Sequence, residues 1–377
     1  MVYSRIYQQL SQYLESNRAL IIYGPRRVGK TTLLQNFLSQ TPLKYKLDSG
    51  DNIKVQNILS SQDFDQIIPY VQGYDIYAID EAQRVPNIGQ GLKIIVDQIP
   101  NIKVIATGSS SFALSGQIGE PLTGRKNTLT LYPLSQIELR LLYNQFELKQ
   151  NLSQVLIYGS YPSVLSASPE KQIAELEEIV NSYLLKDILE LERVKGSKVL
   201  LDLLRLIAYQ IGGEVSLSEL GQQLGIDTKT VARYLDLLEK SFIVYNLRGY
   251  SRNLRSEITK KSKYYFLDNG IRNTIISNFN TLGTRNDLGQ LWENFLVGER
   301  LKAQHYKNIH ANNYFWRTWD KQEIDWIEER EGKLFASEFK YSQKGKHKIP
   351  KMFTATYPES SSQIITPDNF LDFVIPS

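Results

Sequence analysis

A glycine-rich segment, Gly24-Pro-Arg-Arg-Val-Gly-Lys-Thr31, is the feature that most limits what this chain can fold into. The apolar run Ala19–Tyr23 enters it, and Thr31–Leu38, which has helical periodicity, leaves it. A strand, a glycine loop and a helix in this order form a phosphate-binding loop, or P-loop, whose backbone N–H groups surround phosphate oxygens. The pattern therefore predicts an α/β fold with a parallel sheet.

The residues of the P-loop are the expected contacts of a bound nucleotide. Lys30 is placed to meet the β- and γ-phosphates, and the Thr31 hydroxyl is placed to ligate the accompanying Mg²⁺. ATP and Mg²⁺ are therefore the expected cofactors. The expected nucleotide-binding residues here are Gly24, Pro25, Arg26, Arg27, Val28, Gly29, Lys30, Thr31 and Thr32.

A second motif, rich in acids, supports this interpretation. The mostly apolar segment Asp75–Asp80 is typical of a buried strand, and it is followed directly by Glu81, which is the Walker B arrangement. Asp80 is expected to hold Mg²⁺ through water, and Glu81 to orient and polarise the water that attacks ATP. A glutamate directly after the aspartate favours hydrolysis over nucleotide binding alone.

Seven parts of the sequence resemble the prokaryotic AAA-type ATPases whose C-terminal extension is classed as a domain of unknown function. They span nearly the whole chain, so the resemblance covers both the ATPase and the extension. It implies an ATPase core followed by winged-helix and PD-(D/E)xK nuclease-like parts. The similar stretches are Gly24–Thr32, Asp80–Pro86, Thr107–Ser110, Gly124–Arg125 with Pro133–Ser135, Gly159–Pro162, Leu185–Ile188 and Tyr264–Asp268.

The resemblance also suggests two further side chains for the ATP site. In AAA-type ATPases the strand beside Walker B ends in a polar sensor of the γ-phosphate, a role that Thr107 or Ser109 would fill, although either could simply cap a turn. Arg125 is the candidate arginine finger, which acts on the ATP of a neighbouring subunit and therefore implies a homo-oligomer such as a ring. A surface salt bridge is the alternative for Arg125.

Charge is unevenly distributed along the rest of the chain. Residues 136–194 are acidic and rich in helix formers, which suits the helical lid of an AAA module. Residues 195–285 carry 14 Lys and Arg against 8 Asp and Glu, a clustering typical of nucleic-acid binding. A basic surface without a partner is the alternative.

Residues 195–285 also show the element order of a winged helix, whose third helix enters a DNA major groove. The patterned elements are helices over Val199–Ile211, Leu217–Leu224 and Lys229–Lys240, then strands over Phe242–Leu247 and Lys263–Leu267. On the third helix Val231, Leu235 and Leu238 should face the core. The expected DNA contacts are Lys229, Thr230 and Arg233, unless this fold serves only to pack against protein.

Residues 286–377 hold a second constellation of charged side chains. Asp325 is followed after twelve residues by Glu338-Phe-Lys340, and period-2 alternation puts Glu338 and Lys340 on one face of a strand. This is the spacing of PD-(D/E)xK nucleases, in which carboxylates hold Mg²⁺ and the lysine positions or activates the water. A helical glutamate often completes the metal site in that fold.

The helix Leu288–Lys302 offers two candidates for that glutamate. Periodicity alone does not separate Glu293 from Glu299, and the Trp-Glu-Asn-Phe context of the resemblance favours Glu293. Glu293, Asp325 and Glu338 are thus the expected metal ligands. Because many domains of this fold are degenerate scaffolds, the motif alone does not decide whether the domain cuts DNA.

Together these patterns predict four segments. They are an AAA-type P-loop core over 1–135, a helical lid over 136–194, a winged helix over 195–285 and a PD-(D/E)xK nuclease-like α/β domain over 286–377. The predicted function is ATP-dependent processing of DNA, either duplex or branched, by a homo-oligomer. The alternative is an ATP-switched DNA- or protein-binding regulator with an inactive nuclease fold.

Composition excludes several other classes of protein. The chain has no cysteine, which excludes disulfide frameworks, thiolate zinc sites and cysteine nucleophiles. Its three histidines are too few for a His-rich metal site. No apolar run approaches the roughly 18 residues of a membrane helix. A soluble, cytoplasmic protein is therefore expected.

Overall fold

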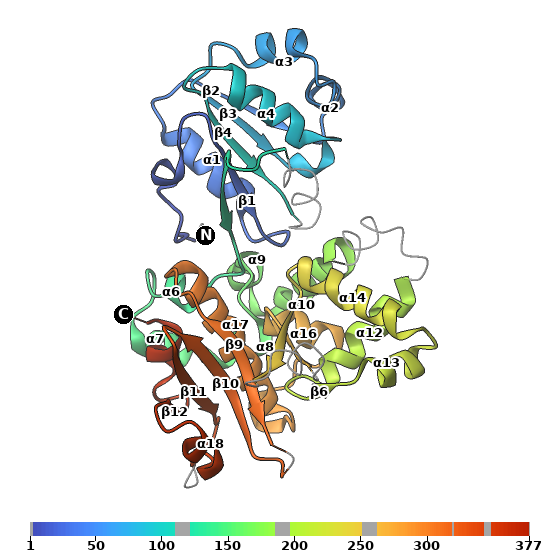
Figure 1. Cartoon of the computed structure of the whole chain (residues 1–377), viewed down its shortest axis with the longest axis vertical. Coiled ribbons are helices and arrows are strands. Elements are labelled where there is room, and N and C mark those ends of the chain that lie inside the picture. The colour runs from blue at the N-terminus through green and yellow to red at the C-terminus, as the bar shows by residue number, and fades with distance from the viewer. Residues whose placement is uncertain are drawn as a thin grey trace. The chain divides into compact units, whose positions relative to one another are not determined.

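The computed structural model describes residues 3–109, 121–184, 197–250, 262–318, 320–342 and 348–376 (Figure 1). It divides into two compact units. The first contains the chain up to Tyr132 together with Lys240–Phe242, and the second contains most of the chain from Pro133 onward. In the described part of the chain, no helix is both long and apolar enough to cross a lipid bilayer.

The first unit is built on a five-stranded parallel sheet in the order β2-β3-β4-β1-β5. This confirms the α/β fold with a parallel sheet that the P-loop predicts. The strands are β1 (Ala19–Tyr23), β2 (Tyr45–Ser49), β3 (Ile76–Asp80), β4 (Lys103–Thr107) and β5 (Lys126–Thr130). The helices are η1 (Leu10–Tyr13), α1 (Lys30–Gln40), α2 (Ile53–Ser60), α3 (Phe64–Val71), η2 (Ala82–Arg84) and α4 (Ile88–Gln98).

Burial explains why the central strands of this unit are continuous apolar runs. Helices on the faces of a parallel sheet exclude water from both sides of each central strand. Every residue of β1 is buried, and so are four of the five residues of β3. Because β3, β4 and β1 are neighbours and run in one direction, their carboxyl ends meet at one edge of the sheet.

The second unit contains a seven-stranded mixed sheet in the order β12-β11-β10-β9-β7-β8-β6. Its strands are β6 (Glu214–Val215), β7 (Val244–Gly249), β8 (Ser262–Phe266), β9 (Asn312–Arg317), β10 (Glu323–Arg330), β11 (Lys333–Phe339) and β12 (Ser361–Ile365). Its longer helices are α8 (Leu152–Tyr158), α10 (Pro169–Glu178), α12 (Ser197–Tyr209), α13 (Leu217–Leu224), α14 (Thr228–Lys240), α16 (Asn269–Ile275) and α17 (Leu288–Tyr306). The shorter helices are α6 (Gln136–Leu139), α7 (Gln145–Gln150), α9 (Pro162–Ser166), η3 (Ile179–Leu184), η4 (Leu282–Thr284), α18 (Lys351–Thr356) and α19 (Phe370–Val374).

The second unit joins the three segments that the sequence analysis separates after residue 135. Strand β7 pairs in parallel with β9, so the strands of 195–285 and those of 286–377 form one sheet. Helix α8, from the expected lid, packs closely on α16: the Asn273 amide donates to the backbone carbonyls of Leu156 and Ile157, at 3.2 and 2.8 Å. A Cβ at Gly270 would lie 2.2 Å from a backbone oxygen of α8, so only glycine permits this approach.

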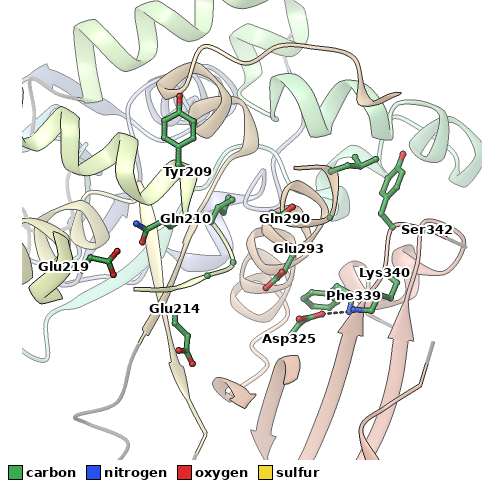
Figure 2. Close-up of a pocket in the computed structure, with 16 residues that line it drawn as sticks. Tyr209, Gln210, Glu214, Glu219, Gln290, Glu293, Asp325, Phe339, Lys340 and Ser342 are labelled. Atoms are coloured by element: carbon green, nitrogen blue, oxygen red, sulfur yellow. Dashed lines mark hydrogen bonds between the residues drawn. The ribbon is translucent and has the colours of Figure 1, made fainter. Parts of the chain in front are cut away.

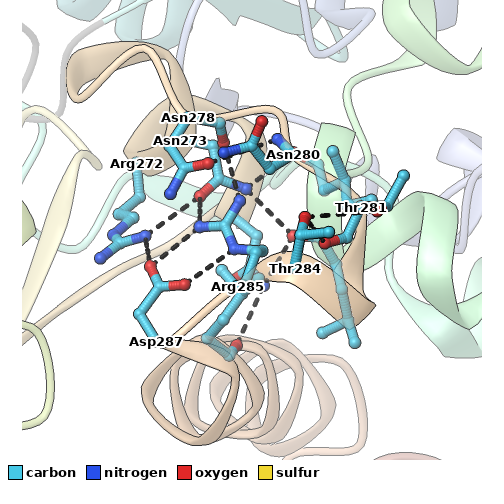
Figure 3. Close-up of polar contacts among 12 residues, drawn as sticks. Arg272, Asn273, Asn278, Asn280, Thr281, Thr284, Arg285 and Asp287 are labelled. Carbon is cyan, nitrogen blue, oxygen red and sulfur yellow. Dashed lines mark hydrogen bonds and ion pairs between the residues drawn. The ribbon is translucent and has the colours of Figure 1, made fainter.

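Two buried arginines share one carboxylate beside the start of α17 (Figure 3). Arg272 Nη1 lies 2.5 Å from Asp287 Oδ2, and Arg285 Nε lies 2.8 Å from Asp287 Oδ1. Arg285 also donates to the backbone carbonyl of Asn278 and to the side chain of Asn273. Burial alone would raise the pKa of Asp287, but Arg285 and Arg272 lower it to about 2. The cluster therefore links α16, the loop after it and α17.

We expect Asp287→Asn to lower the free energy of unfolding by about 3 kcal/mol near pH 7, because it leaves two buried guanidinium groups without their carboxylate. Since the pKa of Asp287 lies below its usual value, this stabilisation is complete above about pH 4 and is lost as the pH falls toward 2. Urea denaturation at several pH values measures it. The control, Asp202→Asn, breaks an exposed pair with Arg205 and should cost less than about 0.5 kcal/mol.

Candidate functional site

The P-loop lies between the end of β1 and the start of α1, as its pattern predicts. Gly24 has φ 149°, and a Cβ there would lie 2.0 Å from the carbonyl oxygen of Leu131, so this position requires glycine. Lys30 is buried, and its Nζ donates to the carbonyls of Gly24 and Pro25, at 2.9 and 2.7 Å. The lysine thus lies over the loop whose N–H groups would receive phosphate.

Three strand ends bring the predicted ATP-site residues together. The Thr31 hydroxyl, at the start of α1, donates to Asp80 Oδ2 at 2.7 Å, and the Thr107 hydroxyl donates to Asp80 Oδ1. The backbone N–H of Glu81 donates to Thr107 Oγ1 at 3.3 Å. Thr31 and Asp80 are oxygen donors of the kind that Mg²⁺ prefers, and they lie together here, so their chemistry suits the ion.

A glutamine that the sequence analysis does not single out holds the Glu81 carboxylate. Gln83 Nε2 donates to Glu81 Oε2 at 2.5 Å and to Ser109 Oγ at 3.0 Å. Glu81 itself has φ 51°, a left-handed conformation that turns the chain sharply at the end of β3. Gln83 belongs to one of the stretches that carry the family resemblance, which is the signal that could have identified it.

Arg5 is a second residue that sequence reasoning misses. Its guanidinium is buried, and it donates to the carbonyl oxygens of Val28, in the P-loop, and Tyr132, at 3.2 and 2.6 Å. Arg5 therefore supports the loop from a segment with no recognisable motif.

Arg125 lies far from the P-loop of its own chain. Its backbone carbonyl accepts from the N–H of Ala19, at the start of β1, whereas the P-loop follows the other end of that strand, about 16 Å away. Its Nε lies 2.5 Å from Asp97 Oδ1, in a pair that is partly exposed. The side chain cannot act on the ATP of its own chain from this position, so a finger role requires a neighbouring subunit.

The second unit has a cavity of about 830 Å³ that contains part of the predicted nuclease site (Figure 2). Glu293 of α17, Asp325 of β10 and Lys340 at the end of β11 all line it. Further acidic lining comes from Glu214 and Glu219. The other lining residues are Tyr209, Gln210, Ile211, Gly212, Gly213, Leu288, Gly289, Gln290, Phe339, Tyr341 and Ser342.

The two strand carboxylates of this site are buried. Asp325 Oδ2 accepts from the backbone N–H of Phe339 at 2.8 Å, and Glu338 Oε1 accepts from Lys340 Nζ at 2.6 Å. Burial raises the pKa of Asp325 well above its usual value, and the carboxylates of Glu293 and Glu338 raise it further. Burial also raises the pKa of Glu338. Glu338 Oε2 has no hydrogen-bond partner among the described residues.

A lysine from β8 reaches Glu293 of the same predicted site. Lys263 is almost fully buried, and its Nζ contacts Glu323 Oε1 and lies 3.4 Å from Glu293 Oε1. Burial by itself would lower the pKa of Lys263, but Glu293, Glu323 and Asp325 raise it above its usual value. Sequence reasoning misses Lys263 because its strand belongs to the predicted winged helix, 30 residues before Glu293.

Periodicity does not decide which of two glutamates of α17 lies at the predicted site, but the structure places them differently. Glu293 lies in the cavity, whereas Glu299 is buried elsewhere and pairs with Lys302 at 2.7 Å and with the backbone N–H of Gln136 at 2.6 Å. Within the described residues, no three acidic or histidine side chains come close enough together to hold one metal ion. The cavity therefore does not fit a divalent ion: Glu293 already lies 3.4 Å from Lys263, and Lys340 already pairs with Glu338.

Helix α14 presents the predicted DNA contacts as expected from its pattern. Val231 and Leu238 are buried, and Lys229 and Arg233 are exposed. Thr230 is half-buried, and its N–H and hydroxyl both donate to Asp227, which caps the helix. Thr230 is therefore engaged at the helix start. Most of the basic loop that follows β7 lies outside the described residues.

Three family models match successive parts of the chain. An AAA domain matches residues 16–140, a domain of unknown function (DUF8612) matches residues 149–282, and another (DUF4143) matches residues 288–370. The second match spans both α8 and α16, which pack together in the structure.

Relatives and solved structures extend the comparison. An uncharacterized protein of Haemophilus influenzae is 30% identical over 289 residues, which cover 70% of this chain and 71% of that protein. The uncharacterized protein Rv2008c of Mycobacterium tuberculosis is 25% identical, over 88% of this chain and 72% of its own. The structure of the Aeropyrum pernix ORC1 protein in complex with DNA is 13% identical over 74% of this chain and 93% of its own, with a TM-score of 0.30.

Proposed function

This chain belongs to an AAA-type ATPase family, and from that premise we propose that it hydrolyses ATP in its first unit and uses the cycle to act on DNA through its second. The convergence of Lys30, Thr31, Asp80 and Thr107 at one edge of a parallel sheet is the observation that carries this proposal. These are the cation, the hydroxyls and the carboxylate that a nucleoside triphosphate with its metal requires.

Different side chains of the first unit would have different roles in ATP hydrolysis. When ATP binds, Lys30 would replace its hydrogen bonds to the loop carbonyls with bonds to the β- and γ-phosphate oxygens. Thr31 and Asp80 would hold Mg²⁺, which supplies neutralising charge to the phosphates. Glu81 accepts a hydrogen bond from the attacking water, and Gln83 orients its carboxylate.

We expect Lys30→Ala and Glu81→Gln to separate binding from hydrolysis. Lys30→Ala removes the cation that meets the phosphates, so ATP affinity should fall at least tenfold. Glu81→Gln keeps the shape of the side chain but loses its negative charge, so ATP should bind normally while turnover falls at least 100-fold. Calorimetric titration with ATP and a phosphate-release assay measure both effects. Lys54→Ala, an exposed lysine of α2, is the matched control. Equal turnover of wild type and Glu81→Gln would reject the assignment.

For DNA, we propose that α12, α13 and α14 with strands β6, β7 and β8 form a winged helix whose third helix contacts duplex or branched DNA. The exposed side chains of Lys229 and Arg233 on α14 support this, as does the net charge of residues 195–285. Thr230 lies beside them, and it would have to release Asp227 before its hydroxyl could contact a DNA phosphate.

We expect the double variant Lys229→Glu, Arg233→Glu to weaken DNA binding without changing basal ATP turnover. If both residues neutralise phosphates, the slope of log affinity against log salt should fall by about 1.8, since each contact contributes about 0.9. Fluorescence anisotropy with labelled duplex at several salt concentrations measures this. The control Lys307→Glu, Lys333→Glu makes the same change of charge at exposed positions elsewhere in the second unit. Equal loss in both variants would contradict a site on α14.

We propose that the protein acts as a homo-oligomer such as a ring. Arg125 is the reason, because its position at the start of β5 excludes a role at its own P-loop. In an oligomer it would release Asp97 and stabilise charge on the γ-phosphate bound by a neighbour.

For residues 286–377, we propose a PD-(D/E)xK nuclease-like domain. Its site would consist of Glu293, Asp325, Glu338 and Lys340. The shared cavity and the pairing of Lys340 with Glu338 support it. The test is cleavage of duplex, single-stranded and branched DNA with Mg²⁺ or Mn²⁺. Cleavage that Asp325→Ala abolishes while ATP turnover and DNA binding persist would support this proposal.

A second candidate function is an ATP-switched DNA- or protein-binding regulator whose nuclease fold is inactive. One observation favours it: Lys263 already lies 3.4 Å from Glu293, a carboxylate on which a nuclease would depend. Cleavage that requires Asp325 would reject this candidate, and intact ATP turnover without cleavage of any of these DNAs would support it.

A further inference from the structure

Lys263 is a buried lysine beside the cavity of the second unit, and one of its partners, Glu293, lines that cavity. It is 1% exposed, and its ammonium group contacts Glu323 and lies 3.4 Å from Glu293. Asp325 is close enough to interact with it electrostatically. A buried ammonium group is costly unless carboxylates compensate it, and Glu323 and Glu293 are the carboxylates that contact this one.

The neighbouring residues fix Glu293 toward this lysine. Tyr265, two residues along β8, donates its hydroxyl to Glu293 Oε1 at 2.6 Å. The other oxygen, Oε2, would lie 3.0 Å from a Cβ at Gly212, which leaves little room on that side. Glu323 is further engaged by Arg317, whose Nε lies 3.6 Å from Glu323 Oε2. The carboxylates are therefore oriented toward protein cations.

We propose that Lys263 is a resident counter-ion that takes the place of a divalent cation at the carboxylates beside this cavity. Its ammonium group and a metal ion would compete for the same carboxylate oxygens, so the native cavity is closed to Mg²⁺ and Mn²⁺ while Lys263 is in place. The cavity is then a structural ion cluster, and Lys263 determines whether it can hold metal.

Removal of the ammonium group should open the site. Without Lys263, the carboxylates of Glu293, Glu323 and Asp325 would repel one another in a buried environment, and a divalent ion would relieve this repulsion. Methionine matches the length of the lysine stem without its charge. Arginine keeps the charge and serves as the matched control.

The experiment measures Mn²⁺ binding to the full chain by isothermal titration, without nucleotide and with Asp80→Asn in every protein to silence the ATP site. We expect Lys263→Met to bind Mn²⁺ at least tenfold more tightly than its parent, and to gain thermal stability from Mn²⁺ that the parent does not gain. Lys263→Arg should behave like the parent. Equal Mn²⁺ affinity of Lys263→Met and the parent would overturn the proposal.

A second comparison does not depend on the folding of the Lys263 variants. The Asp80→Asn chain and the same chain with Asp325→Asn should give identical Mn²⁺ isotherms. Metal binding that Asp325→Asn removes would show that the native cavity holds the ion beside Lys263, which overturns the proposal. This inference concerns the same cavity as the proposed nuclease. Metal binding alone tests the inference, whereas DNA cleavage tests the nuclease proposal.

Discussion

The buried polar side chains of α17 are the contacts on which the second unit depends. Asn294 accepts from the backbone N–H of Phe266 and donates to its carbonyl, at 2.7 and 3.0 Å, which holds β8 against the helix. Arg300 pairs through two nitrogens with Glu328 of β10. Glu299 and Lys302 bond the backbone around Gln136. Each buried group would be costly if unpaired, so these pairs specify one arrangement of segments distant in sequence.

The cavity follows from that arrangement. Because Asn294 holds β8 at Phe266, the side chains of Lys263 and Tyr265 reach the adjacent Glu293. The pairing of β10 with β11 then brings Asp325 to the backbone of Phe339, beside Lys340. One helix and three strands thus collect acids and lysines in one buried place, where low polarity strengthens every charge interaction.

The two units use charge in different ways. In the first, Lys30 Nζ donates to the carbonyls of Gly24 and Pro25, which phosphate oxygens can replace as acceptors. In the second, Lys263 is itself buried and bonds the carboxylates of Glu293 and Glu323, so any replacement must match its charge. The first arrangement suits a site that a ligand enters and leaves, whereas the second suits a permanent ion cluster.

The sequence by itself determined the local parts of this protein. Strand β1, the P-loop and α1 follow from one glycine pattern, and the ends of β3 and β4 place Asp80 and Thr107 because parallel neighbours share an edge. Only the tertiary structure decided that β7 pairs with β9, and that Lys263 of β8 lies beside Glu293 of α17. The reason is physical: periodicity specifies which face of an element is buried, but the partner of a buried charge depends on contacts between elements far apart in the chain.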